Sequence, residues 1–319
     1  MTLSFSQEAH FSTTFKRKIA PFWQQRQDGF TAGQGQQPLY WAAMTAPQHK
    51  KAIVVVNGRI ESVWKYQELF YDLFQQGYDI YSYDHRGQGL SARLCPDPQM
   101  GYVEHFEDYV HDLATLVEQW PLEGYQSCHL LAHSMGGAIA TRYLQNNPDS
   151  PFDAMALSSP MFGVCMPWYL RPIARQLSQL LAACHSSPNY APGHGSYYAK
   201  PFLNNRLTQS KNRYQWFRDL YESMPALKLG GPSSHWVAKS LRAAQSCIDD
   251  AKQLHLPTLI LQAELDKIVA NPSQQRFADQ AGDPVALQVI KNARHEILFE
   301  VDPVRNQALQ ALLQHFEKY

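Results

Sequence analysis

Short apolar runs alternate with stretches of helical periodicity along most of this 319-residue chain. The run Ile-Val-Val-Val-Asn at 53–57 is rich in β-branched residues, as in strands that are buried on both faces. Similar runs occur at 78–83, 128–132, 154–159, 258–263 and 286–291. Apolar residues recur at helical spacing from Tyr66 to Phe74, and Gly77 then provides a stop. This alternation predicts an α/β fold with a mostly parallel central sheet flanked by helices.

Two segments depart from that alternation. Residues 1–37 are polar and glutamine-rich, and we expect an irregular or partly helical lead-in there. Residues 161–245 contain no run that predicts a parallel strand, only helical and irregular stretches rich in aromatic residues. We therefore predict a core built from residues 38–160 and 246–319. We expect residues 161–245 to form a largely helical cap over the carboxyl ends of the strands, where open α/β sheets bind ligands.

The chain is neutral as a whole but polarised along its length. Its 28 Lys and Arg balance 28 Asp and Glu, so nothing points to nucleic acid as a partner. Residues 161–245 hold ten Lys and Arg against two acidic side chains, so the predicted cap carries +8 and the remainder −8. Such a cap suits phosphate-bearing lipids or an anionic membrane surface. A solvated basic face, balanced by the acidic core, is the alternative interpretation.

The composition and the N-terminal sequence indicate where in the cell the protein is located. The chain is 45% hydrophobic, which suits a globular protein, and its first ten residues lack the basic-then-apolar pattern of a signal peptide. No uncharged apolar run approaches the ~20 residues that span a bilayer. Five cysteines without metal-type spacing fit reduced thiols. We expect a cytoplasmic protein whose membrane contact is peripheral, at the inner face of the inner membrane.

The chemistry is indicated by Leu-Leu-Ala-His-Ser-Met-Gly-Gly-Ala-Ile-Ala at 130–140. A strand ends near Ala132, a helix begins near Met135, and Ser134 occupies the turn between them. The small residues Ala132, Gly136 and Gly137 allow a sharp turn and close packing of the helix on the sheet. This arrangement predicts a serine nucleophile whose hydroxyl is presented by a strained turn, and an ordinary helix N-cap serine is the alternative.

A serine nucleophile needs a base, and the base needs an acid that orients it. His295 follows the last predicted strand, and Asp266 follows the strand at 258–263. We therefore assign Ser134, His295 and Asp266 as the catalytic residues.

Three other residues compete for these roles. Glu264 lies nearer the strand end than Asp266 and is the second choice for the acid, and Asp249 is a further competitor. His133 adjoins the serine, but a neighbour on a tight turn points elsewhere.

An acyl-transfer site also needs backbone donors for the oxyanion. Met135 follows the nucleophile and supplies one N–H. The turn after the strand at 53–57 supplies the other, because Gly58 allows the chain to bend and directs the N–H of Arg59 inward. We expect the Arg59 side chain to form an ion pair with Glu61 or Asp84, and a contact with the substrate is the alternative.

Five motifs carry a resemblance to a known family. They are Asn-Gly-Arg-Ile-Glu-Ser (57–62), Asp-His-Arg-Gly-Gln-Gly-Leu-Ser (84–91), Ala-His-Ser-Met-Gly-Gly (132–137), Gln-Ala-Glu-Leu-Asp-Lys-Ile-Val (262–269) and Arg-His-Glu-Ile-Leu-Phe-Glu (294–300). Together with the order Ser, Asp, His they resemble the α/β-hydrolase superfamily, its monoacylglycerol-lipase-like branch and, within it, the bacterial lysophospholipases of L-two type. Asn57 and Ala132 depart from the His and Gly of the family pattern, and neither change removes a backbone donor or the turn.

The resemblance implies an α/β-hydrolase fold and a serine esterase that releases a fatty acid from lysophospholipids through an acyl-serine, without a metal or organic cofactor. The alternatives are a monoacylglycerol lipase or carboxylesterase, a lysophospholipid transacylase, and a non-catalytic lipid-binding protein. The expected partners are a lysophospholipid or monoacylglycerol substrate and an anionic membrane touched by the basic cap. In the Asp-His-Arg-Gly turn, the resemblance implies structural ion pairs of Asp84 and Arg86 beneath the oxyanion loop.

Overall fold

A single eight-stranded sheet organises the molecule, in the order β1-β2-β4-β3-β5-β6-β7-β8. The computed structural model describes residues 4–166, 180 and 187–319. The strands are β1 (Gln27–Ala32), β2 (Pro38–Met44), β3 (Lys51–Val56), β4 (Tyr78–Tyr83), β5 (Ser127–His133), β6 (Ala154–Ser158), β7 (Thr258–Ala263) and β8 (Val285–Ile290). Strands β3 to β8 are parallel to one another, whereas β2 is antiparallel to both β1 and β4.

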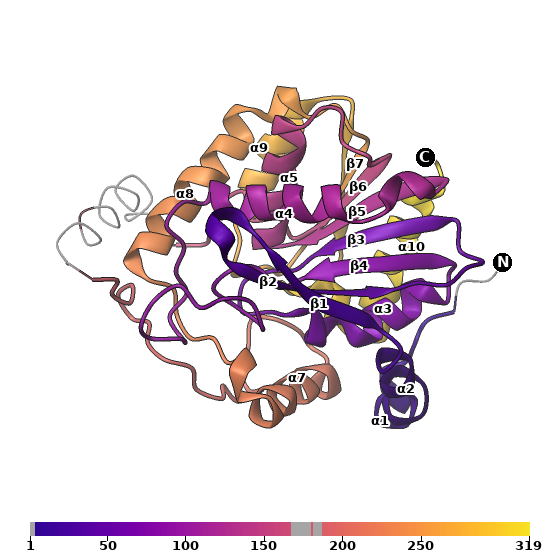
Figure 1. Cartoon of the computed structure of the whole chain (residues 1–319), viewed down its shortest axis with the longest axis horizontal. Coiled ribbons are helices and arrows are strands. Elements are labelled where there is room, and N and C mark those ends of the chain that lie inside the picture. Colours follow the sequence, from indigo (N-terminus) through magenta and orange to yellow (C-terminus); the bar gives the residue numbers. More distant parts are fainter. Residues whose placement is uncertain (1–3, 167–179, 181–186) are drawn as a thin grey trace.

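Helices cover both faces of this sheet (Figure 1). They are α1 (Phe11–Thr14), α2 (Ala20–Trp23), α3 (Gln67–Phe74), α4 (Glu107–Gln119), α5 (Met135–Asn146), α7 (Lys211–Ser223), α8 (Ser234–Asp249), α9 (Asn271–Ala281) and α10 (Asp302–Phe316). One buried cluster joins the sheet to α4, α5, α8 and α9, and a second joins it to α2, α3 and α10. The predicted α/β fold with a mostly parallel sheet is confirmed.

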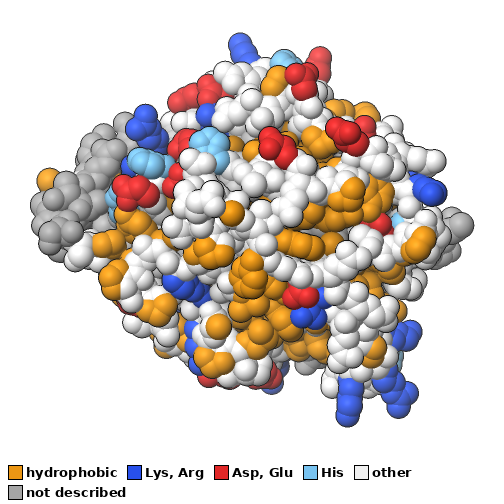
Figure 2. Space-filling view, in the orientation of Figure 1, with side chains coloured by type: hydrophobic (Ala, Val, Ile, Leu, Met, Phe, Trp, Pro, Cys, Tyr) orange, Lys and Arg blue, Asp and Glu red, His pale blue; other side chains and the backbone are white. Residues whose placement is uncertain are grey.

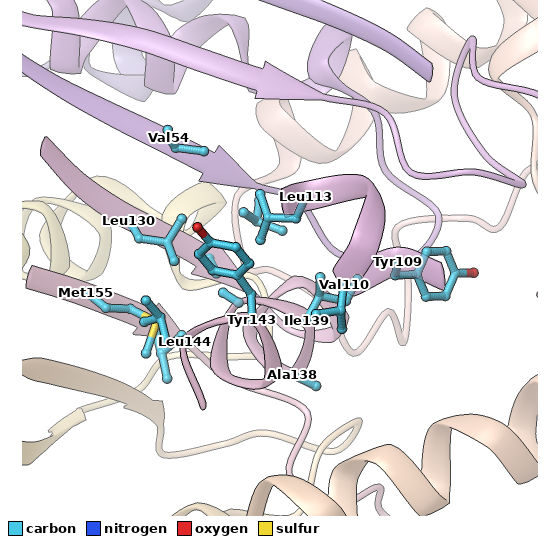
Figure 3. Packing of buried hydrophobic residues seen from close by; sticks show 14 of the residues in the cluster. Val54, Tyr109, Val110, Leu113, Leu130, Ala138, Ile139, Tyr143, Leu144 and Met155 are labelled. Atoms are coloured by element: carbon cyan, nitrogen blue, oxygen red, sulfur yellow. The ribbon is translucent and has the colours of Figure 1, made fainter. Parts of the chain in front are cut away.

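The apolar residues of a single strand serve both clusters. Val54 and Val56 of β3 belong to the cluster with α4 and α5, while Ile53 and Val55 belong to the cluster with α3 and α10. Successive side chains of a strand point to opposite faces, so a strand covered on both sides must be apolar throughout. Figure 3 shows the first cluster, where Val54 lies near Leu113 and other residues of α4 and α5.

The sheet extends further toward the N-terminus than we expected. Residues 27–32 form β1, which pairs with β2 at the edge of the sheet, rather than an irregular or helical lead-in. The sequence Gln-Asp-Gly-Phe-Thr-Ala has few apolar residues because β1 is largely exposed, so it lacks the pattern of a buried strand. The expected lead-in over residues 1–37 is therefore wrong for β1, although α1 and α2 agree with its partly helical character.

The predicted boundary at residue 245 also falls inside an element. Helix α8 runs without a break from Ser234 to Asp249 and packs beside α5 and α9, so most of it belongs with the core helices. The described segment that precedes it, residues 187–233, lies against the loops that follow β3 and β4. Gly230 donates its N–H to the carbonyl of Gln99, and the Tyr221 hydroxyl donates to the carbonyl of Ile60.

Candidate active site

Ser134 lies on a strained turn between β5 and α5. Its backbone has φ 52° and ψ −117°, a conformation that is costly for a residue with a side chain. Gly136 makes this turn possible, because a Cβ atom there would collide with the carbonyl oxygens of Val56 and Asn57. The sheet edge and the helix thus meet closely, and the serine is held at the carboxyl end of the central strands.

Two side chains from distant loops extend from this serine in a hydrogen-bonded chain. The Nε2 atom of His295 is 2.9 Å from the Oγ atom of Ser134. Its Nδ1 atom is 2.8 Å from Oδ2 of Asp266. Asp266 follows β7 and His295 follows β8, so both reach the site from neighbouring parallel strands. The structure brings together the three residues that the sequence analysis assigned as catalytic.

The Asp266 carboxylate is fixed from its far side as well. Its Oδ1 atom accepts the N–H groups of Ile268 at 2.7 Å and Val269 at 3.0 Å. Burial by itself raises the pKa of this carboxyl, but the hydrogen bonds from His295 and from the two amides outweigh it and lower the pKa below its ordinary value. The carboxylate therefore stays ionised and presents one oxygen to the imidazole.

The competing residues have other partners. Glu264 pairs with Lys291 at 2.7 Å on the surface and accepts the N–H of Asn292. Asp249 accepts a hydrogen bond from Gln245 at an exposed position of α8. His133 is buried beside His295, with 4.9 Å between the ring centroids, but its Nδ1 atom is 3.0 Å from the carbonyl oxygen of Ser158. Burial lowers the pKa of His133 to about 4.

The loop after β3 packs directly against Ser134. A Cβ atom at Gly58 would lie 3.3 Å from that of Ser134, so only glycine fits there without a shift. The Gly58 N–H donates to the carboxylate of Glu61, which leaves the Arg59 N–H as the next donor along the loop. Met135 is the first residue of α5, a position whose N–H has no partner within the helix.

A buried ionic cluster holds this loop. Glu61 accepts hydrogen bonds from Lys65 and from the Tyr66 hydroxyl, both at 2.6 Å. Lys65 also pairs at 2.7 Å with Glu296, the residue after His295. One lysine thus connects the loop after β3 with the loop that carries the histidine. Sequence analysis missed this cluster, although the i, i+4 spacing of Glu61 and Lys65 was a signal that could have indicated it.

Over residues 4–166, 180 and 187–319, the ion pairs that we expected for Arg59 and Asp84 are not found. Among the described residues, the Arg59 guanidinium pairs with no carboxylate: its Nη2 atom donates to the carbonyl of Gly230 at 2.7 Å. Asp84 accepts the N–H groups of Val63 and Leu90, and burial raises its pKa to about 7. Arg86 does form ion pairs, but with α4, through Asp112 at 2.6 Å. A buried carboxyl that two amides already satisfy does not require a cation.

Comparison with known proteins identifies the family. A family model described as serine aminopeptidase, S33 (Hydrolase_4), matches residues 47–302, and this match includes all three residues of the hydrogen-bonded chain. This protein belongs to that family of α/β-hydrolases. The match covers most of the chain and agrees with the fold class that the sequence predicted.

Relatives within this hydrolase family cover nearly the whole chain. The lysophospholipase L2 of Escherichia coli is 40% identical over 98% of this chain and 94% of its own length. A probable lysophospholipase L2 of Haemophilus influenzae is 37% identical, with 97% of each chain covered. The human monoglyceride lipase is 25% identical over 86% of this chain and 84% of its own.

A solved structure shares the fold. The monoglyceride lipase of Saccharomyces cerevisiae superposes with a TM-score of 0.72 at 18% identity, over 92% of this chain and 94% of that one. Over the part of the chain that is described, no helix is long and apolar enough to cross a membrane. In the same residues, no group of three or more His, Cys, Asp or Glu could hold a metal ion.

Proposed function

We propose that this protein is a lysophospholipase that cleaves the acyl ester through Ser134. The observation that carries the proposal is the hydrogen-bonded chain from Ser134 through His295 to Asp266, placed at a strained turn at the carboxyl end of the sheet. The nearly full-length likeness to the lysophospholipase L2 of Escherichia coli supports the choice of substrate.

In this proposal the three side chains have distinct roles. His295 accepts the proton of the Ser134 hydroxyl at Nε2, and the serine oxygen attacks the ester carbonyl. The N–H groups of Arg59 and Met135 stabilise the oxyanion. The glycerol oxygen leaves with the proton from His295, and an acyl-serine forms. Water, deprotonated by His295, then releases the fatty acid, while Asp266 orients the imidazole and stabilises its cation.

A monoacylglycerol lipase is the second candidate, and the 25% identity with the human monoglyceride lipase favours it. The chemistry is the same, so only substrates distinguish the two. We expect wild-type protein to hydrolyse a lysophospholipid with a higher kcat/KM than a monoacylglycerol of the same acyl chain. A higher kcat/KM for the monoacylglycerol contradicts the proposed substrate class.

The same assay distinguishes the remaining alternatives. Mass spectrometry separates hydrolysis from transacylation, because a transacylase yields a diacyl product instead of free fatty acid. A lipid-binding protein without catalysis yields neither product. We expect free fatty acid from the wild-type protein and none from Ser134→Ala.

Peripheral membrane contact from the cytoplasmic side belongs to the same proposal. Lys200 and Arg206, which precede α7, and Lys211, its first residue, are exposed together with the apolar side chain of Leu203, which is 77% exposed. Basic side chains attract anionic lipids by about 1 kcal/mol each near the surface, and apolar ones can enter the interface.

A second group of exposed basic side chains adjoins this segment. Lys16, Arg17 and Lys18 lie between α1 and α2, where Figure 2 shows lysine and arginine side chains projecting from the surface. The aromatic ring of Phe15 packs against Trp216 of α7 at 4.9 Å. The N-terminal helices thereby place further positive charge next to the cap helix.

Vesicle binding tests the membrane contact. The triple charge reversal Lys200→Glu, Arg206→Glu and Lys211→Glu should weaken binding to anionic vesicles and remove most of its salt dependence. The matched control reverses Lys252, Arg276 and Lys318, which are exposed in the core part of the chain. Equal losses in the two triple variants exclude a specific role for the cap.

A further inference from the structure

Arg59 is a half-buried cation that makes few hydrogen bonds with the described residues. Its guanidinium lies over the ring of Trp236, 5.1 Å from the ring centroid, and one N–H reaches the carbonyl of Gly230. Its Nε atom is buried without a hydrogen-bond partner. An arginine presents five N–H donors in a rigid fork that matches a phosphate or carboxylate. Among the described residues, Nη1 has no hydrogen-bond acceptor and is the part of the fork that remains for a ligand.

The protein supplies no counter-charge for this guanidinium. No ion pair involves Arg59 in residues 4–166 or 187–319, and the stretches 1–3, 167–179 and 181–186 contain no Asp or Glu in their sequence. Among the described residues, the groups that favour its charged form are the tyrosines Tyr109, Tyr221 and Tyr190. Burial accordingly lowers the pKa of Arg59 to about 10. A buried charge without a partner is costly, and an anionic ligand would relieve that cost.

The position of Arg59 relates this cation to the reacting serine. Its neighbour Gly58 packs against Ser134, so the backbone of Arg59 lies at the site where an ester carbonyl would bind. From there the Arg59 side chain extends to the region between Gly101, in the loop after β4, and Gly230. In a lysophospholipid, the glycerol backbone separates the ester carbonyl from the phosphodiester in the same way. An arginine side chain has a similar length.

We infer that the Arg59 side chain binds the phosphodiester group of the lysophospholipid while the ester lies at Ser134. This inference rests on the proposed function and adds a residue that selects the substrate class. One residue then serves both ends of the substrate, with its backbone N–H at the ester and its guanidinium at the phosphate. An uncharged monoacylglycerol gains nothing from the second contact.

A purely structural role for Arg59 is the competing explanation, because its bond to Gly230 ties residues 187–233 to the core. Arg93 provides a matched control for that role. Its guanidinium donates to the carbonyls of Gly87 at 2.8 Å, Gly89 at 3.0 Å and Ala226, so it joins the same two parts with both terminal nitrogens occupied. Burial lowers the pKa of Arg93 as well. It differs from Arg59 in having its donors satisfied.

The first experiment compares substrates. The variants Arg59→Gln, Arg59→Lys and Arg93→Gln are assayed with lysophosphatidylethanolamine and with monoacylglycerol of the same acyl chain. For Arg59→Gln we expect the ratio of the two kcat/KM values to fall about 10- to 100-fold, mainly through KM, as for one lost charge-assisted hydrogen bond. Arg59→Lys keeps the charge and should lose less than about tenfold. Arg93→Gln should leave the ratio unchanged.

An equal loss of kcat/KM on both substrates for Arg59→Gln would overturn the inference and indicate a purely structural role for Arg59. Thermal unfolding of each variant shows whether it is folded, and Arg59→Lys keeps the test open if the glutamine variant is unstable. If the wild-type protein does not hydrolyse lysophosphatidylethanolamine at all, the proposed function fails.

A second experiment tests the phosphodiester site without lysophospholipid turnover. Glycerophosphoethanolamine should inhibit hydrolysis of p-nitrophenyl butyrate competitively, with an inhibition constant about 10- to 100-fold higher in Arg59→Gln than in wild type. Inorganic phosphate should inhibit less, because it cannot occupy the glycerol position. An inhibition constant that is the same in both proteins contradicts the inference, and stronger inhibition by inorganic phosphate indicates a site for free phosphate instead.

Discussion

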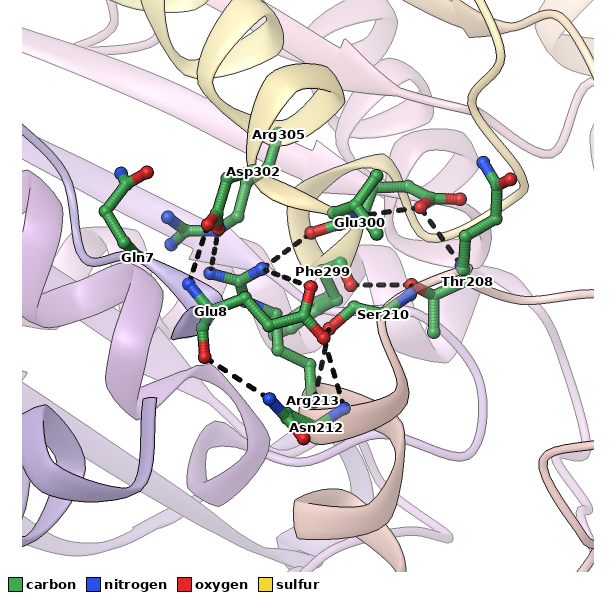
Figure 4. Close-up of polar contacts among 12 residues, drawn as sticks. Gln7, Glu8, Thr208, Ser210, Asn212, Arg213, Phe299, Glu300, Asp302 and Arg305 are labelled. Carbon is green, nitrogen blue, oxygen red and sulfur yellow. Dashed lines mark hydrogen bonds and ion pairs between the residues drawn. The ribbon is translucent and has the colours of Figure 1, made fainter. Parts of the chain in front are cut away.

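Arg213, which is buried, and Arg59, which is half-buried, both join the segment 187–233 to the rest of the molecule, and their electrostatic surroundings are opposite. Arg213, at the start of α7, donates to Glu68 of α3 at 2.7 Å. It also donates to Asp302 of α10 at 2.9 Å, and Figure 4 shows these two residues together. Burial alone lowers the pKa of Arg213, but these two carboxylates outweigh burial and raise it. Arg59, at the Ser134 edge, pairs with no carboxylate among the described residues, and its pKa falls.

This difference distinguishes a structural contact from a ligand-binding site. We call the contact of Arg213 with Glu68 and Asp302 the α7 anchor, and the region of Arg59 and Ser134 the Ser134 edge. At the α7 anchor every nitrogen of the guanidinium has an acceptor, because Arg213 also donates to the carbonyl of Glu300 at 2.8 Å. Such a cluster is complete without a ligand and fixes how α7 sits on α3 and α10. At the Ser134 edge, strain and an unneutralised cation persist in the free protein, as is common where a ligand completes the structure. We therefore expect changes at the edge to affect activity and changes at the anchor to affect stability.

The largest effect should follow from Ser134→Ala. Loss of the nucleophile removes the covalent route, and kcat should fall about 10⁶-fold. Stability should remain or rise slightly, because the hydroxyl is not needed for the fold and the strained backbone is unchanged. Steady-state kinetics and a fluorophosphonate probe check both expectations. Labelling of another serine in the variant, or retained hydrolysis, would break the proposed distinction between edge and anchor.

Asp266→Asn should have the next largest effect. The amide cannot stabilise the imidazolium and favours the wrong tautomer of His295, so kcat should fall about 10⁴-fold. Glu264→Gln is the matched control, since Glu264 lies two residues away and pairs with Lys291 on the surface. The measured kcat values of the two variants show which carboxylate orients His295. A larger loss in Glu264→Gln would show that the carboxylate was wrongly assigned.

The parts of this site that the sequence predicts are those set by strand ends. Ser134, Asp266 and His295 each lie within a few residues of a strand whose apolar pattern is unambiguous, and parallel strands bring their carboxyl ends to one edge. The order along the chain was therefore sufficient to group them. The strands β3 to β8 were predictable for the same reason, whereas β1 lacks the apolar pattern because it is exposed.

Pairings between side chains from distant elements could not be predicted. Arg213 and Glu68 are 145 residues apart, and nothing local to either residue indicates the other. For Arg59, nearness in sequence favoured Glu61 or Asp84, but Lys65 occupies Glu61 and two amides satisfy Asp84. The partners of a charged side chain depend on which groups the fold leaves unsatisfied, and that is known only from the assembled structure.

Arg213→Met tests the anchor. Removing the guanidinium leaves Glu68 and Asp302 without the cation that donates hydrogen bonds to both, which should lower the free energy of unfolding by about 3–5 kcal/mol. Urea unfolding measures this change. Arg206→Met is the control at an exposed position of the same segment, where we expect a change within about 0.5 kcal/mol.

The activity of folded Arg213→Met provides a second comparison of the α7 anchor with the Ser134 edge. Below its unfolding transition, Arg213→Met should keep a kcat near that of wild type, because the anchor contributes no group to the reaction. A variant that is stable but inactive would show that the α7 anchor belongs to the site.

The smallest effect concerns Glu61. This residue lies at the Ser134 edge, but Lys65 neutralises its charge, as Glu68 and Asp302 neutralise that of Arg213 at the α7 anchor. Burial alone raises the pKa of Glu61, but Lys65 and, less strongly, His133 and the Tyr66 hydroxyl lower it to about 2. A carboxyl whose pKa is lower in the folded protein stabilises the fold above its unfolded pKa of 4.5 and loses this contribution as the pH falls. Between about pH 6 and about pH 3.5, the loss should be about 1–2 kcal/mol.

Urea unfolding of wild type and Glu61→Gln across that pH range measures the contribution, because other titrations cancel in the difference. We expect wild type to exceed the variant in stability at about pH 6, and the gap to narrow by about 1–2 kcal/mol at about pH 3.5. The remaining carboxylate of the cluster, Glu296, keeps Lys65 paired in the variant. A difference in the free energy of unfolding that does not change with pH would mean that Lys65 does not keep Glu61 ionised. The cluster of Glu61 and Lys65 would then resemble the unpaired Arg59 more than the α7 anchor.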